Sequence, residues 1–407
     1  MSVVFDRPYE FIPRHRGNWW PSFIKYARLA DFYLAKKEGV VSIETRHAER
    51  LSASAKQGHG VIVAPNHCRY ADPLVMAGPV RAAKLNFYAM ASWHLFNKGK
   101  FDSFAMRKCG AFSLHREGTD RKSLDTAIEI LSTAERPLLM FPEGMTFRTN
   151  DQLRPFLDGL SFIARTAARR RAKQVDGGKV VAHSMAIKYL CKIDCTGWAR
   201  EQLNGLERHF CFRKMLKSDD LIVRTIRIAD AMLAMSETEY LGAPVIGDPQ
   251  VRCESLAHNL LSQAEANLGL TPADTKDIHE RSRMIRSQVA NQYFEADDLN
   301  LQRRLRDDAM CADLAQEYTA YSHNYLLSPD VTDTRVVETI QRLQERIYGK
   351  ANRKIPLHCV IDIGEAIEIP AAKAPRSVLD PVLSDIHTQL FGMLERLAAE
   401  ARPWPIR

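Results

Sequence analysis

The sequence predicts an α/β protein with a mostly parallel central sheet flanked by helices and a large all-helical insertion. Between about residues 45 and 190, short apolar runs alternate with helical stretches, as they do in βαβ units. From about residue 200 to 350 the apolar residues recur almost entirely at helical spacing. The strand-like run CVIDIGEAIEIP follows at 359–370, and it most simply returns to the first sheet.

The first part of the chain contains several strand candidates, each a short apolar run. They cover residues 61–65, 85–90, 111–114, 138–141 and 180–188. A helix is expected at 123–134, where apolar residues recur on one face. A last amphipathic helix is expected at about 377–399.

The N-terminal segment contains one expected helix at 19–37. Trp19 and Trp20 stand at its start, and lysines and arginines surround its apolar residues. This arrangement suits a membrane surface, and it suits equally well a helix packed on the body of the protein.

The changes of pattern divide the chain into three expected parts. Residues 1–45 form the amphipathic segment that is a candidate for lying against a membrane. The α/β domain combines residues 46–199 with 356–407, and the helical insertion covers residues 200–355.

The composition fits a globular protein with an anionic partner. The 407 residues are 45% hydrophobic and 26% charged, and the formal net charge is +8. Lipid headgroups, coenzyme A thioesters, acidic carrier proteins and nucleic acid all suit this charge.

Three features indicate a cytoplasmic protein that does not cross a membrane. The eight cysteines show no zinc-finger spacing, so we expect free thiols in a reducing compartment. The first residues lack the apolar core of a signal peptide. No uninterrupted apolar run reaches about 18 residues, so we expect no helix that spans the bilayer.

The first block that could carry chemistry is PNHCRYADP, residues 65–73. It follows a predicted strand, so His67 would stand at the edge of the sheet where α/β proteins bind ligands. A histidine can take the proton of an attacking hydroxyl, and Asp72 could orient the imidazole. Asp72-Pro73 is also an ordinary helix start, and His67 alone could be a histidine of the core.

Two further blocks end at the same predicted edge. In GAFSLHRE, residues 110–117, Arg116 offers a guanidinium that matches a phosphate, although a surface ion pair is the simpler reading for a lone arginine. In LLMFPEGMTFR, residues 138–148, a strand runs into a turn. The polar or glycine positions of that turn are Glu143, Gly144, Thr146 and Arg148.

Taken together, the three blocks resemble the signature of the glycerolipid acyltransferases, which include the glycerol-3-phosphate and 1-acylglycerol-3-phosphate acyltransferases. That signature is NH-x4-D, then G-x-F-x-x-x-R, then FPEG. The matching residues are Asn66-His67 with Asp72, Gly110 with Phe112 and Arg116, and Phe141-Pro142-Glu143-Gly144. The resemblance covers about residues 45–190 and 356–400.

The resemblance implies an O-acyltransferase of phospholipid synthesis. His67 would be the general base with Asp72 as its partner, and Arg116 would bind the phosphate of the acceptor. The other implied substrate-binding residues are Asn66, Glu143, Gly144, Thr146 and Arg148. The donor would be acyl-CoA or an acyl-carrier protein, the acceptor a lipid at the inner membrane surface. No metal, other cofactor or nucleic-acid partner is implied.

Two departures from the family pattern concern the acceptor. Met145 separates Gly144 from Thr146, which displaces Arg148, and Ser184 stands where the family usually has a proline. An acceptor outside the glycerophosphates, such as an ornithine-type lipid or a saccharolipid, is therefore an alternative. A non-catalytic lipid-binding scaffold is another, although such a protein has no need of a base with an orienting carboxylate.

Overall fold

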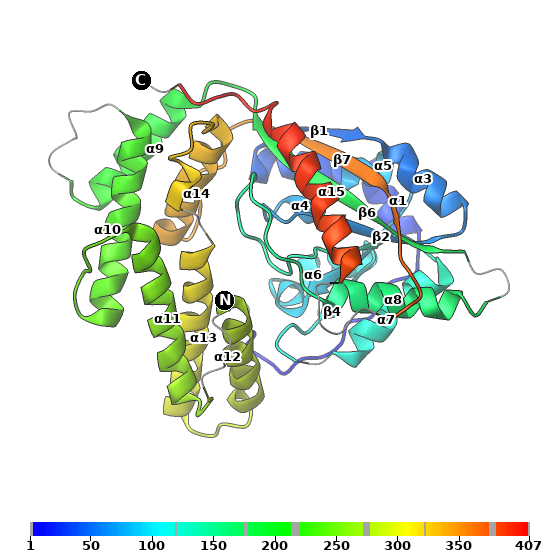
Figure 1. Cartoon of the computed structure of the whole chain (residues 1–407), viewed down its shortest axis with the longest axis horizontal. Helices are drawn as coiled ribbons and strands as arrows, with labels where there is room; N and C mark the ends of the chain where they lie inside the picture. The colour runs from blue at the N-terminus through cyan, green and yellow to red at the C-terminus, as the bar shows by residue number, and fades with distance from the viewer. Residues whose placement is uncertain are drawn as a thin grey trace.

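The computed structural model describes residues 3–118, 120–174, 178–212, 220–271, 277–320, 323–373 and 380–405. Within these residues, an α/β body and a group of long helices lie side by side (Figure 1). The helical group consists of the segments between β6 and β7, so the chain leaves the sheet and later returns to it. The boundaries that we assign to the three parts of the chain stay a prediction.

One seven-stranded sheet forms the centre of the described structure, in the order β1-β7-β6-β2-β5-β3-β4. All neighbouring pairs are parallel except β6 and β7, which are antiparallel. The predicted fold class is therefore confirmed. The strands are Val40–Arg46 (β1), Gly60–Pro65 (β2), Tyr88–Ser92 (β3), Ala111–Leu114 (β4), Leu138–Leu139 (β5), Val180–Cys191 (β6) and Leu357–Glu368 (β7).

Both faces of the sheet are covered. Along β2, Val61 and Val63 belong to one buried core cluster, whereas Ile62 and Ala64 belong to another. Successive side chains of a strand point to opposite faces, so this strand is apolar on both sides. The helices and 3₁₀ turn of the α/β body are Ala48–Lys56 (α3), Asp72–Val75 (α4), Ala77–Ala82 (α5), Trp93–Asn97 (η2), Lys100–Lys108 (α6), Arg121–Thr133 (α7), Gly159–Arg171 (α8) and Pro381–Ala398 (α15).

The helical region contributes to two different cores. Leu203 of α9, Ile228 of α10 and Val337 of α14 are buried in the same cluster as Val61 and Val63, so these helices cover one face of the sheet. Helices α11, α12 and α13 share a separate cluster, to which Leu233 of α10 and Val3 also contribute. The bounds are Thr196–His209 (α9), Leu221–Leu241 (α10), Pro249–Asn267 (α11), Ile278–Tyr293 (α12), Leu299–Thr319 (α13), His323–Tyr325 (η3) and Asp333–Tyr348 (α14).

The prediction of a single helix at 19–37 is wrong. The segment forms Trp19–Tyr26 (α1), Leu29–Tyr33 (α2) and a short π-helix, Leu34–Glu38 (η1). The interruption falls at Arg28, whose φ of 54° lies in the left-handed region. The resulting change of direction buries Leu34 completely while Tyr26 and Phe32 stay exposed.

None of the helices in the described residues combines the length and the apolar character that crossing a bilayer requires.

Candidate active site

His67 lies in the loop between β2 and α4, beside the carboxylate that begins α4. Its Nδ1 is 2.8 Å from Oδ2 of Asp72, and Asp72 is completely buried. The backbone N–H of Arg69 donates to the same oxygen at 2.8 Å, and the hydroxyl of Tyr189 donates to Oδ1 at 2.6 Å. These donors fix the carboxylate, which in turn fixes the tautomer of His67 with the proton on Nδ1.

The second ring nitrogen of His67 faces a hydroxyl group. Its Nε2 is 2.8 Å from Oγ1 of Thr146. Because Nδ1 carries the proton, Nε2 is the acceptor and Thr146 the donor. A carboxylate, an imidazole and a hydroxyl are therefore connected by consecutive hydrogen bonds. This is the arrangement that a general base needs when it activates an alcohol.

The FPEG turn encloses His67. The ring of Phe141 stacks on the imidazole with centroids 4.1 Å apart, and the N–H of Phe147 donates to the His67 carbonyl at 3.2 Å. Glu143 accepts from the backbone N–H groups of His67 at 2.7 Å and Arg154 at 3.1 Å. Both oxygens of Glu143 therefore hold the surrounding loops together. Burial raises the pKa of Glu143 to about 8, against these two hydrogen bonds.

Arg116 and Gly144 meet at the tip of this turn. The Arg116 guanidinium donates from Nη1 to the Gly144 carbonyl at 2.6 Å. Gly144 has a φ of +73°, in the left-handed region, so the turn favours glycine. Burial lowers the pKa of Arg116, and the positive charge of Arg286 acts in the same direction.

Besides Glu143, two more of the residues expected to bind substrate have protein partners instead. Asn66 is buried and exchanges two hydrogen bonds with the backbone of Ile187 on β6, at 3.0 and 2.7 Å. Arg148 pairs with Glu345 of α14 and donates to the hydroxyl of Tyr70 at 2.7 Å. In this structure Asn66 positions the loop of His67, and Arg148 joins that region to the helical insertion.

The structure adds residues from α12 and α13 that sequence motifs do not reveal. The ring of Phe147 lies 5.5 Å from the ring of His279 and 5.5 Å from the guanidinium of Arg154. His279 contacts Gln316 at 3.1 Å, and Gln316 accepts from Arg286 at 2.7 Å. Helix α12 therefore lies beside Phe147, close to the FPEG turn, and the positive charge of its Arg286 acts on Arg116.

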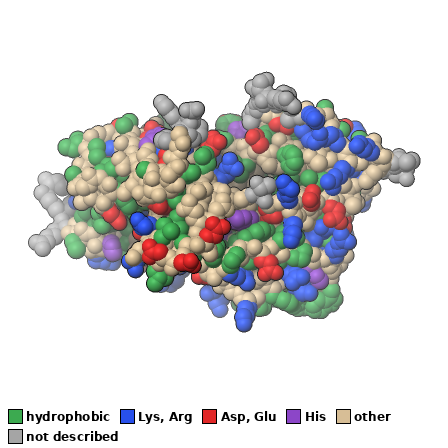
Figure 2. Space-filling model, turned by 90° about the horizontal axis from the view of Figure 1, so that it is seen from below, with side chains coloured by type: hydrophobic (Ala, Val, Ile, Leu, Met, Phe, Trp, Pro, Cys, Tyr) green, Lys and Arg blue, Asp and Glu red, His purple; other side chains and the backbone are tan. Residues whose placement is uncertain are grey.

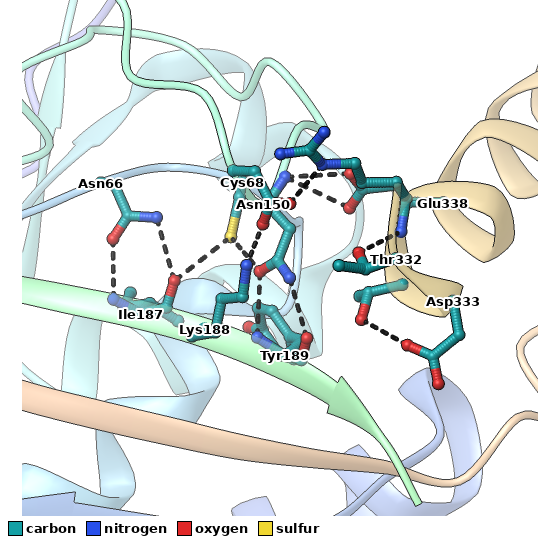
Figure 3. A network of polar contacts seen from close by, with 12 residues as sticks. Asn66, Cys68, Asn150, Ile187, Lys188, Tyr189, Thr332, Asp333 and Glu338 are labelled. Atoms are coloured by element: carbon teal, nitrogen blue, oxygen red, sulfur yellow. Dashed lines mark hydrogen bonds and ion pairs between the residues drawn. The ribbon is translucent and has the colours of Figure 1, made fainter. Parts of the chain in front are cut away.

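A polar network under the site connects β6 to α14 (Figure 3). Asn150 exchanges hydrogen bonds with the backbone of Tyr189 at 2.8 and 2.9 Å, and its own N–H donates to Glu338 at 3.1 Å. Next to it, buried Lys188 pairs with Asp151, and burial lowers the pKa of Lys188 to about 8. The segment at Asn150 and Asp151, which follows the FPEG turn, is thus held by β6, and Asn150 also by α14.

All eight cysteines are free thiols. Cys68, beside His67, is buried, and burial raises the pKa of its thiol well above the ordinary value. A thiol that stays protonated is a poor nucleophile, which agrees with a packing role for Cys68. Within the described residues, the group with spacing suitable for a metal is Cys191, Cys195 and Asp333, whose ligand atoms lie within 4.8 Å of one another.

Comparison with known proteins agrees with this geometry. A protein-family model described as Acyltransferase matches residues 42–188, which contain all three sequence blocks. This region of the chain is therefore similar to the acyltransferase family. The resemblance to the glycerolipid acyltransferases is thereby confirmed.

A curated relative supports the same assignment. The chain is 34% identical over 84 residues to the 1-acyl-sn-glycerol-3-phosphate acyltransferase of Streptococcus pneumoniae. The matched part is 21% of this chain and spans 30% of the length of that relative. No solved structure matches the chain.

Proposed function

We propose that this acyltransferase moves a fatty acyl group from acyl-CoA or an acyl-carrier protein to the hydroxyl of a glycerophosphate or lysophospholipid. The observation that carries the proposal is the chain of hydrogen bonds from Asp72 through His67 to the hydroxyl of Thr146. The relative's name, which specifies 1-acyl-sn-glycerol-3-phosphate, supports this class of acceptor.

In the proposed reaction, the acceptor hydroxyl takes the place of Thr146 at Nε2 of His67. His67 removes the hydroxyl proton as the oxygen attacks the thioester carbonyl, and Asp72 stabilises the imidazolium. The new C–O bond forms, the C–S bond breaks, and the proton passes from His67 to the leaving thiolate. No further group is needed to balance this transfer.

Arginines near the site support an anionic acceptor. Arg116 donates through Nη1 to the Gly144 carbonyl, and its buried Nε has no hydrogen-bond partner among the described residues. The charge of Arg286 reaches Arg116 from the insertion. Guanidinium groups bind phosphate oxygens through paired hydrogen bonds, so these residues suit a phosphate beside the reacting hydroxyl.

We propose that the protein works at the inner face of a membrane without crossing it. Trp19, Tyr26, Phe32 and Phe101 are each about 70% exposed or more, at 71%, 77%, 69% and 78%. The ring centroids of Trp20 and Phe104 are 5.7 Å apart, so α1 contacts α6. Exposed aromatic side chains favour the headgroup region of a bilayer. Lys and Arg side chains gather at the end of the molecule that carries α7 and α8 (Figure 2), which suits anionic lipid.

The test is thiol release from acyl-CoA by the purified protein with lysophosphatidate as acceptor. His67→Ala is expected to lower acceptor-dependent release by about 10²–10⁴-fold. His209→Ala, which changes an exposed histidine on α9, is the matched control and should retain activity. Release that does not depend on His67, or that occurs without acceptor, would contradict the proposal.

A further inference from the structure

The helical insertion contains an apolar cavity of about 180 Å³ between α10, α11 and α14. Its volume slightly exceeds the roughly 150 Å³ of an apolar cavity that accepts benzene. Ala229 and Arg346 in its lining are exposed, so the cavity opens to solvent on one side. Much of the lining is apolar, including Ile226, Met232, Leu233, Cys253, Leu326 and Leu343.

Helix α14 separates this cavity from the catalytic loops and contacts both. On one side, Gln341 accepts from Arg69 at 3.0 Å and Glu345 pairs with Arg148. On the other side, Leu343 and Arg346 line the cavity. Helix α14 therefore forms part of the cavity wall and also contacts Arg69 and Arg148, near His67.

One cationic side chain is shared between the cavity and a second pocket. Arg342 lines the apolar cavity, and it also lines a smaller polar pocket together with Cys68, Arg69 and Tyr70. Its Nη2 donates to the Glu317 carbonyl, which fixes the guanidinium at this junction. A molecule with an apolar chain and an anionic or ester end would find complementary surfaces on the two sides of Arg342.

We propose that this cavity binds the hydrocarbon chain of a lipid, with the polar end of that lipid directed toward Arg342. A methylene chain in this cavity removes its own surface and the apolar lining from water, which stabilises the complex. The volume fits a segment of a chain rather than a whole lipid. Binding of the chain does not depend on the proposed function. A role of this lipid as a substrate does rest on it.

The experiment measures binding of a dansyl-labelled undecanoic acid to the full chain by the fluorescence of the dansyl group. Ala229→Trp places a bulky ring at the opening of the cavity and is expected to weaken probe binding about tenfold or more. Met235→Trp is the matched control, because Met235 is exposed on the same helix and does not line the cavity. It should bind like the wild type.

A second arm tests the chain and its polar end. Saturated fatty acids of increasing length should displace the probe with an affinity that rises roughly fourfold per buried methylene until the cavity is full. Arg342→Gln should weaken binding of the carboxylate probe more than binding of the matching alcohol. Equal probe affinity for the wild type and Ala229→Trp, or no dependence on chain length, would overturn the proposal.

A third arm identifies the lipid that supplies the chain. Displacement of the probe by lysophosphatidate would assign the cavity to the acceptor, and displacement by acyl-CoA would assign it to the donor. Displacement by neither would refute a role for the cavity in substrate binding. If the wild type transfers no acyl group but the probe binds as expected, the proposed function fails and the cavity assignment stands.

Discussion

Replacing Thr146 by valine tests whether the hydroxyl of Thr146 occupies the position of the acceptor hydroxyl. Valine has nearly the same shape, so the substitution mainly removes the 2.8 Å hydrogen bond to Nε2 of His67. A neutral hydrogen bond contributes about 0.5–1.5 kcal/mol beyond what water offers. The free protein should therefore lose about that much unfolding free energy.

Loss of the hydrogen bond between Thr146 and His67 should strengthen binding of the acceptor. In the wild type the acceptor must displace Thr146 from His67, whereas in Thr146→Val that contact is already absent. The KM for the acceptor is then expected to fall by about 2- to 12-fold, with little change in kcat. Thiol release as a function of lysophosphatidate concentration measures both constants, and urea denaturation measures stability.

The expected pattern is that stability and acceptor affinity move in opposite directions. Thr126→Val is a suitable control, because the Thr126 hydroxyl donates to a carbonyl on the exposed surface of α7. A higher KM, or a kcat reduced by more than about tenfold, would refute the reasoning. Thr146 would then take part in the reaction rather than compete with the acceptor.

Three other substitutions are expected to have separable effects. Asp72→Asn should lower kcat by about 10²–10⁴-fold in the thiol assay without unfolding the protein, since its amide oxygen can still accept from His67; full activity would contradict the orienting role. Glu143 has a folded pKa of about 8 and an ordinary value of 4.5, so its stabilising effect is complete below about pH 4.5 and lost as the pH rises toward 8. In Glu143→Gln, the free energy of unfolding measured by urea denaturation should fall less between pH 4.5 and pH 8 than in the wild type. An equal fall in both proteins would show that the pKa of Glu143 is ordinary in the folded state. Arg286→Gln should raise the KM for a phosphate-bearing acceptor about tenfold or more, while exposed Arg283→Gln should not; equal effects would exclude a specific role.

The strands that could be predicted from sequence are those whose signal is local. β2 is apolar at every position because both of its faces are buried, and its start and end agree with the prediction within one residue. β1 was not predicted, since Val40–Arg46 is mostly half-exposed and pairs with β7 alone. A strand of this kind carries little apolar periodicity, and its partner lies far away in the chain.

The same distinction applies to the candidate site. His67 and Asp72 are five positions apart, so their pairing across a helix start could be expected from the sequence. Tyr189, which donates to Asp72, lies far away in the chain on β6. The residues around Tyr189 in the sequence do not indicate this contact. Arg148 has a φ of 61° and pairs with Glu345 of α14. No motif in the sequence encodes such a contact with a distant helix.

The position of β1 has a consequence for the way the chain folds during synthesis. Within the described residues, 40–46 pair with 357–368 alone, so β1 is made long before its partner exists. At about 5–20 residues per second, the ribosome needs on the order of tens of seconds to supply β7. Until then β1 and the neighbouring edge of β6 present unpaired backbone groups, which can pair with strands of other chains. Nascent chains of this protein are therefore expected to depend on chaperones to avoid aggregation.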